Sequence, residues 1–264
     1  MGNKEILGVA VIAIIAVLAC TFIVDSNHDG DNTERIGIIA AMDDEISALR
    51  DAMDMEYTET LCDMTYNVGT LNGKNVVLVK CGMGKVNAGI CAEMLITHFN
   101  AYCVINTGVA GSMDNALDIL DFVVSTDVVQ HDFDVSPIGF KKGEIPYTGK
   151  VSFEADPELT DKAALAISQF AMGSKIMQGR ICTGDQFINS EEQKDTILSN
   201  FGGLCCEMEG GAIAQVCYLS DIPFVIVRAI SDKADHSSSM DYDKFEPIAA
   251  ERSARAVMYM IDLL

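Results

Sequence analysis

The stretch that most constrains the fold runs from residue 206 to residue 235, CEMEGGAIAQVCYLSDIPFVIVRAISDKAD. Its first residue ends a short apolar run. Acids follow, then small residues typical of a helix start, and a second apolar run occupies residues 223–230. This pattern predicts a strand, a helix and a second strand. Because the strands of an α/β sheet direct their carboxyl ends into one crevice, we expect Glu209 and Asp232 to converge there.

Two converging carboxyl groups indicate acid–base chemistry, since a protonated carboxyl can deliver a proton and a carboxylate can accept one. The alternative is that Glu209 and Asp232 are ordinary acids at helix starts, where such side chains accept backbone N–H groups. Taken alone, this stretch leaves both interpretations open.

The alternation of strands and helices continues over the rest of the chain. Residues 35–41 form an almost continuous apolar run, as in a strand buried on both faces of a sheet, and apolar residues follow at helical spacing. Further strands are predicted at residues 102–106, 122–129 and 176–183, a hairpin at 66–80, and helices ending near 99 and spanning 156–170 and 242–264. We expect an α/β fold, a three-layer sandwich with a mixed, mainly parallel central sheet, preceded by an N-terminal apolar segment.

Composition limits the partners and cofactors. The net charge of -21 in 264 residues argues against nucleic acid and anionic membrane surfaces as partners, because both would repel the chain. The nine cysteines include no CxxC pair, and many lie in apolar segments: Cys81, Cys91, Cys103, Cys182 and Cys217. We therefore expect buried thiols, no metal site and no cofactor.

Residues 6–24, ILGVAVIAIIAVLACTFIV, form a charge-free, mostly apolar segment long enough to span a bilayer. Its residues 17–20, VLAC, also resemble a bacterial lipobox, in which Cys20 would be lipidated after cleavage. We expect residues 1–24 to be a membrane anchor or a lipoprotein signal.

A polar linker at residues 25–34 would join this segment to a domain at residues 35–264. Lys4 precedes the apolar segment and several acids follow it, which favours a cell-membrane protein with its domain outside the cytoplasm. A domain on the cytoplasmic face stays open as the alternative.

Five motifs in order along the chain are similar to those of one enzyme family. They are GIIAAMDDEISAL (37–49), INTGVAG (105–111), TGDQFIN (183–189), EMEGGAIA (207–214) and RAISDKAD (228–235). Together they resemble the 5'-methylthioadenosine/S-adenosylhomocysteine nucleosidases of the nucleoside phosphorylase superfamily. The resemblance implies that the domain at residues 35–264 has the fold of that superfamily and hydrolyses the N-glycosidic bond of methylthioadenosine, adenosylhomocysteine or both, releasing adenine.

The resemblance also implies roles for individual residues. Asp232 would protonate adenine at N7, Glu45 would orient and deprotonate the water, and Glu209 would accept hydrogen bonds from the ribose hydroxyls. Burial beside Glu209 is expected to raise the pKa of Asp232. Phe187 and Ile188 would contact the adenine. Further substrate-binding candidates are Met42, Met83, Val109, Ala110, Gly111, Glu207, Met208, Arg228 and Ser231, of which the last two would also fix the acids.

Two implications concern residues outside the acids. Family members commonly carry serine where this chain has Val109, so one hydrogen bond near the ribose or the attacking water is in doubt. The family also covers the 5' substituent with a loop of a neighbouring subunit. In a homodimer, Ile138 and Pro146 of the irregular loop at residues 131–147 would then line that pocket.

Two other functions compete with hydrolysis. A phosphorolytic purine nucleoside phosphorylase would use phosphate in place of water, but Glu45 would repel phosphate and the glycine loop after Cys81 has no arginine. A catalytically inactive, membrane-tethered nucleoside-binding protein is the other alternative, and the three acids together argue against it. Methylthioadenosine, adenosylhomocysteine and an aminofutalosine-type nucleoside all remain open as the preferred substrate.

Overall fold

The first strand, β1 (Arg35–Ala40), is buried along its whole length, as its almost continuous apolar sequence predicts. The computed structural model describes residues 32–264. The apolar segment at residues 6–24 and most of the linker therefore lie outside the described residues.

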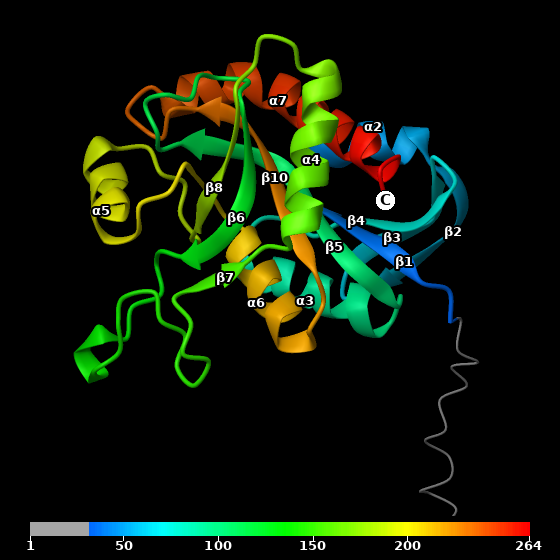
Figure 1. Cartoon of the computed structure of the whole chain (residues 1–264), viewed down its shortest axis with the longest axis horizontal. Coiled ribbons are helices and arrows are strands. Elements are labelled where there is room, and N and C mark those ends of the chain that lie inside the picture. Colours follow the sequence, from blue (N-terminus) through cyan, green and yellow to red (C-terminus); the bar gives the residue numbers. More distant parts are fainter. Residues whose placement is uncertain (1–31) are drawn as a thin grey trace, which may run out of the picture. The chain divides into compact units, whose positions relative to one another are not determined.

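The strands belong to one ten-stranded sheet in the order β10-β6-β8-β9-β5-β1-β4-β3-β2, with β7 beside β6. β5 also pairs with β10, so the pairings β5–β9–β8–β6–β10 close on themselves, and β1 to β4 extend the sheet outward (Figure 1). The bounds are β2 (Asp54–Leu61), β3 (Met64–Leu71), β4 (Lys74–Lys80), β5 (Ala101–Ser112), β6 (Phe122–Gln130), β7 (Ser152–Glu154), β8 (Ile176–Thr183), β9 (Cys205–Glu207) and β10 (Phe224–Asp232).

The sheet is mixed, as expected. β1 is parallel to both its neighbours, β4 and β5, and β10 is parallel to β5. The pairs β2–β3 and β3–β4 are antiparallel hairpins, and β9 is antiparallel to β5. The parallel strands β1, β5 and β10 bring their carboxyl ends to the same edge.

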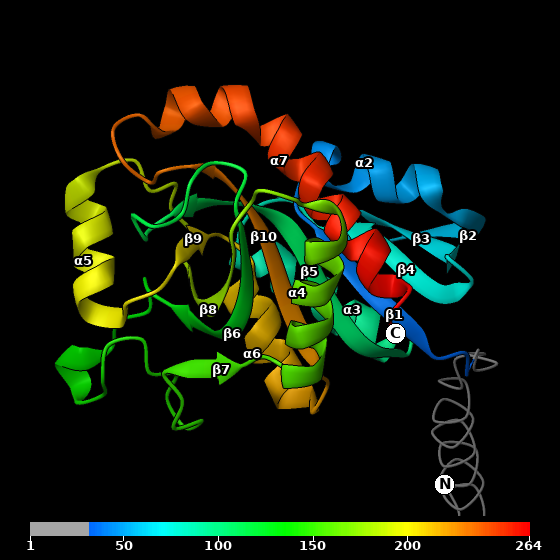
Figure 2. The same ribbon diagram turned by 45° about the horizontal axis from the view of Figure 1, so that its top comes forward.

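Helices cover both faces of the sheet, which confirms the three-layer arrangement. Apolar residues of α2, α4 and α7 pack in one core, and those of α3 and α6 pack in a second core on the opposite face (Figure 2). The bounds are α2 (Asp43–Ala52), α3 (Lys85–Thr97), α4 (Pro157–Phe170), α5 (Glu191–Phe201), α6 (Gly210–Ser220) and α7 (Ser238–Ile261), with a short 3-10 helix η1 (Ser136–Ile138).

β5 differs from its prediction in length. The expected strand ended at Asn106, because the glycines and small residues that follow are typical of a strand terminus. The observed strand continues through Thr107 and Gly108 to Ser112 and is buried along almost all of this length. These small residues lie inside the sheet because polar side chains from other elements pack against them.

The cysteines predicted to be buried small hydrophobes are buried and free, whereas Cys62 is exposed. Residues 32–264 hold no cluster of metal-ligating side chains that could bind an ion. No helix in this range is both long and apolar enough to cross a bilayer.

Candidate active site

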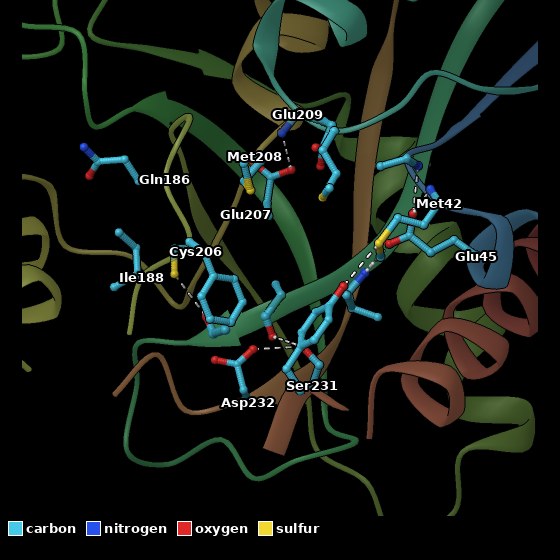
Figure 3. Close-up of a pocket in the computed structure, with 17 residues that line it drawn as sticks. Met42, Glu45, Gln186, Ile188, Cys206, Glu207, Met208, Glu209, Ser231 and Asp232 are labelled. Carbon is cyan, nitrogen blue, oxygen red and sulfur yellow. Dashed lines mark hydrogen bonds between the residues drawn. The ribbon is translucent and has the colours of Figure 1, made fainter. Parts of the chain in front are cut away.

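A pocket opens where β1, β5, β9 and β10 end, and the segments after β4 and β8 complete its wall (Figure 3). Most of the residues predicted from the sequence line it: Met42, Glu45, Met83, Val109, Ala110, Gly111, Phe187, Ile188, Glu207, Met208, Glu209, Ser231 and Asp232. The acids Glu45, Glu209 and Asp232 lie on three sides of the pocket (Figure 3). The expected convergence of strand ends is therefore present.

Glu45 is held by backbone groups of the segment between β1 and α2 and of β5. It lies in the first turn of α2, and its Oε2 accepts the N–H of Ala41 at 2.7 Å and that of Met42 at 3.0 Å. Its Oε1 accepts the N–H of Val109 at 3.0 Å. Burial raises the pKa of this carboxyl, although the charge of Arg228 and the three N–H groups favour the ionised form.

The doubt raised by Val109 concerns its side chain, and the contact that the structure shows is made by its backbone. A serine hydroxyl is absent here, but the backbone N–H of Val109 bonds to Glu45 directly. The neighbouring Gly108 is required by packing, because a Cβ there would lie 2.0 Å from Arg228 Nη1 and 2.5 Å from Glu45 Oε1. β5 thus positions Glu45 through its main chain.

Arg228 lies behind the pocket wall and does not line the pocket. Its guanidinium is fully buried and donates to Glu207, to Asn106 Oδ1 at 2.6 Å and to Glu209 Oε2 at 3.4 Å. Arg228 was predicted both to bind substrate and to fix the acids. The structure shows contacts with the acids and places the side chain outside the pocket lining.

Glu207 lines the pocket, and its carboxylate bonds to several protein groups. Its carboxylate accepts the N–H groups of Glu209 and Gly210, at 3.1 and 2.8 Å, and also bonds to Thr183 and Arg228. These protein donors occupy the carboxylate, so it holds the start of α6 and the guanidinium in place.

Glu209 is held at the start of α3, and its pKa is raised. Its Oε1 accepts the N–H of Gly84 at 2.9 Å, where the chain turns into α3 with a φ of 98° that favours glycine. Burial raises the pKa of Glu209 to about 7; the Arg228 charge opposes this rise, and the nearby Glu207 and Glu45 add to it.

A bulge in β10 sets the orientation of the Asp232 side chain. Ile230 is registered with Ala110 and Asp232 with Gly111, so Ser231 is an extra residue against β5. Such a bulge re-aims the side chains beside it. Asp232 Oδ2 accepts the Ser231 hydroxyl at 2.9 Å, and Oδ1 accepts the N–H of Ala234 at 2.8 Å.

Burial raises the pKa of Asp232, and hydrogen bonds from Ala234, Ser238 and Ser231 oppose the rise. The like charge that adds to it comes from Asp241 of α7. The expectation that Glu209 would be this neighbour is wrong, because Glu209 lies on another side of the pocket (Figure 3).

Four further residues line the pocket and were not predicted from the sequence: Ala41, Gln186, Cys206 and Tyr242. Gln186 and Ala41 adjoin predicted residues, so the motifs that contain them could have identified both. Tyr242 lies on α7, far from any strand end, and no local pattern marks it. Its ring meets Phe187 edge to face at 5.5 Å, and its hydroxyl lies 3.2 Å from Met42 Sδ.

Ile138 and Pro146 do not line the pocket of their own chain. Ile138 is 73% exposed, in η1 of the loop that follows β6. Their assignment to the pocket of a neighbouring subunit stays a prediction.

The comparisons with known proteins agree with this geometry. The family model described as the phosphorylase superfamily matches residues 35–262. A 5'-methylthioadenosine/S-adenosylhomocysteine nucleosidase of Haemophilus influenzae (strain PittGG) is 40% identical over 232 residues, which is 87% of this chain and 100% of that protein.

Two solved structures illustrate the likeness in fold. The methylthioadenosine/adenosylhomocysteine nucleosidase from Neisseria meningitidis, in complex with methylthio-immucillin-A, is 36% identical with a TM-score of 0.84, covering 88% of this chain and 100% of that one. The futalosine hydrolase of Helicobacter pylori strain 26695 is 31% identical with a TM-score of 0.83, covering 88% and 98%. The chain therefore belongs to the phosphorylase superfamily and, within it, to the family of 5'-methylthioadenosine/S-adenosylhomocysteine nucleosidases.

Proposed function

We propose that this protein hydrolyses the N-glycosidic bond of 5'-methylthioadenosine, S-adenosylhomocysteine or both, releasing adenine. The observation that carries this proposal is the arrangement of Glu45, Glu209 and Asp232 on three sides of one pocket (Figure 3). Cleavage needs a proton for the departing base, an oriented water and a partner for the ribose hydroxyls.

Asp232 is the proposed acid. Adenine leaves poorly as an anion, so its N7 must gain a proton as the bond breaks. A free aspartate, with a pKa of about 3.9, is almost fully ionised at neutral pH. The raised pKa of the buried Asp232 favours the protonated form that this step requires.

Glu45 is the proposed base that orients and deprotonates the water. The three backbone N–H groups fix both carboxylate oxygens, and Oε1, which accepts one of these bonds, keeps acceptor capacity for a water molecule. Glu209 is the proposed acceptor for the ribose hydroxyls. Met208 would pack beneath the sugar, and Phe187 with the Ile188 backbone would contact the base.

Phosphorolysis is less compatible with the pocket. No arginine or lysine is among the described residues that line it. The N–H groups of Gly84 and Lys85, at the start of α3, already donate to the carboxylates of Glu209 and Asp185 at 2.9 and 2.8 Å. A helix start that could bind phosphate is thus occupied by protein acids.

The test is release of adenine from 5'-methylthioadenosine by a domain beginning at Thr33, with and without phosphate. We expect the same rate in both conditions and free methylthioribose as the second product. Detection of a ribose 1-phosphate product would show that the reaction is phosphorolysis and not hydrolysis. Absence of adenine release would favour the alternative of an inactive nucleoside-binding protein.

We also propose that the protein is a homodimer whose partner completes the pocket. Apolar side chains are exposed beside the pocket: Met83, which lines it, is 60% exposed, and Val86 in the first turn of α3 is 74% exposed. Ile138, exposed on the loop after β6, supplies a matching apolar side chain. Such a surface is typical of a protein interface.

Light scattering of the domain should give the mass of two chains, and a Val86→Asp variant should be monomeric with reduced turnover. A fully active monomer would contradict the dimer.

We further propose that residues 6–24 hold the protein in the cell membrane with the acidic domain outside the cytoplasm. Protease added to intact cells should then remove the domain, whereas a domain protected until lysis would reverse the orientation. Cys20→Ala distinguishes the two forms of attachment, because only a lipoprotein would lose its processing.

A further inference from the structure

Lys194 of α5 makes two hydrogen bonds to main-chain carbonyls. Its Nζ donates to Ser112 O at 2.9 Å and to Lys233 O at 2.8 Å. Ser112 is the last residue of β5, and Lys233 directly follows the end of β10. One ammonium group thus joins two strand ends and the helix that carries it.

The two carbonyls lie at a particular place in the sheet. The last registered pair of β5 and β10 is Gly111 with Asp232, directly after the bulge at Ser231. The two acceptors of Lys194, Ser112 O and Lys233 O, belong to the residues that directly follow this pair in the sequence. At this point the ladder between the strands ends, and the lysine supplies the connection beyond it.

The bulge makes this connection important for Asp232. A bulged residue leaves the local ladder disrupted, so its neighbours need other contacts to keep one orientation. Of the groups that hydrogen-bond to the Asp232 carboxyl, Ser231 and Ala234 belong to the same segment and would move with it, and Ser238 belongs to α7. Lys194, on α5, holds the main chain next to Asp232 from a further element.

Lys194 also connects the segment of Asp232 with the segment that carries Phe187 and Ile188. α5 begins shortly after Phe187 and Ile188, and the Ser190 side chain caps its start by accepting the N–H of Gln193 at 3.2 Å. The next residue is Lys194. The Lys194 side chain therefore links the segment of Phe187 and Ile188, proposed to contact the base, to the segment of Asp232, the proposed acid.

We propose that Lys194 is a positioning residue that holds the end of β10 so that the Asp232 carboxyl meets N7 of the bound base. This inference rests on the proposed function, in which Asp232 delivers the proton. Lys194 does not line the pocket and acts through the main chain on either side of the bulge. A displacement of about 1 Å can cost up to ~100-fold in rate, so loss of such a contact is measurable.

The test is a double-mutant cycle with Lys194→Met, which keeps a straight side chain and removes the donors, and Asp232→Asn. Lys194→Met should lower kcat for 5'-methylthioadenosine by ~10-fold with KM changed less than ~3-fold. In the Asp232→Asn background the same change should lower kcat less than ~2-fold, because the acid that it positions is already gone.

The matched control is Lys175→Met. Lys175 Nζ also donates to a main-chain carbonyl, that of Ala116, and lies outside the pocket lining. This variant should keep wild-type kcat, and thermal unfolding of all variants identifies any general loss of fold.

A Lys194→Met variant with wild-type kcat, an equal fall in kcat in both backgrounds, or an equal fall in the Lys175→Met control would overturn the proposal. Absence of adenine release by the wild-type enzyme would instead refute the proposed function.

Discussion

The buried guanidinium of Arg228 and the carboxylate of Glu209 lie 3.4 Å apart, and the same guanidinium bonds to Glu207. This fully buried guanidinium thus forms ion pairs with two buried carboxylates, and its positive charge also favours the ionised form of Glu45. The negative charges of these pocket acids are therefore balanced by Arg228, which does not line the pocket.

Arg228→Met should destabilise the protein strongly, because it leaves buried carboxylates without their cation. Removing one partner of a buried ion pair costs about 3–5 kcal/mol. Urea unfolding measures the loss. The control Arg50→Met, on the exposed surface of α2, should change stability by less than about 0.5 kcal/mol. Equal unfolding midpoints for the two variants would show that Arg228 does not balance these acids.

Glu209→Gln should stabilise the protein at high pH. The folded-state pKa of Glu209, about 7, lies above its ordinary value of 4.5. Stability linked to this group is therefore fully present below pH 4.5 and is lost as pH rises through about 7. Glutamine remains neutral throughout, so the variant should gain on the order of 2–3 kcal/mol over the wild type at pH 8.5 and much less at pH 5.

Urea unfolding of the Glu209→Gln variant and the wild type at both pH values checks this expectation. A difference that does not grow with pH would mean that burial does not disfavour the Glu209 charge. The variant should also turn over slowly, since an amide cannot replace the carboxylate that accepts the ribose hydroxyls.

Val109→Ser should leave turnover within about 3-fold of the wild type. The contact with Glu45 is made by the backbone N–H of residue 109, which the substitution retains. Replacing a buried valine by serine should cost about 1 kcal/mol of stability, through lost apolar burial. Steady-state kinetics and thermal unfolding measure the two effects. A turnover raised by about an order of magnitude or more would show that the missing hydroxyl limits this chain.

The strand-end residues were predictable because the sequence marks them twice, by an apolar run that stops and by small or acidic residues directly after it. Glu209 and Asp232 follow this pattern, whereas Glu45 was identified through the family resemblance. The long β5 was not predictable in the same way. Gly108 looks like a strand terminus from the sequence, and only the packing of Arg228 and Glu45 against it explains a glycine inside a strand.

Elements without a strong apolar pattern were missed. β2 is mostly exposed, so its sequence, DMEYTETL, lacks the run of buried residues that identifies a strand. α5 is also polar, but Ser190 followed by Gln193 is a capping-box signal that could have located its start. Tyr242 reaches the pocket only because α7 crosses the sheet, which a local pattern does not record.

The most direct test of the central claim is the Asp232→Asn variant, assayed for kcat, for binding of an adenine nucleoside and for melting temperature on the same preparation. Asparagine keeps the shape but cannot deliver a proton to N7. We predict that kcat falls at least ~100-fold while binding stays nearly unchanged. If Asp232 were only a cap, the variant would lose about 1 kcal/mol of stability and turn over normally. An active but less stable Asp232→Asn variant would therefore contradict the account.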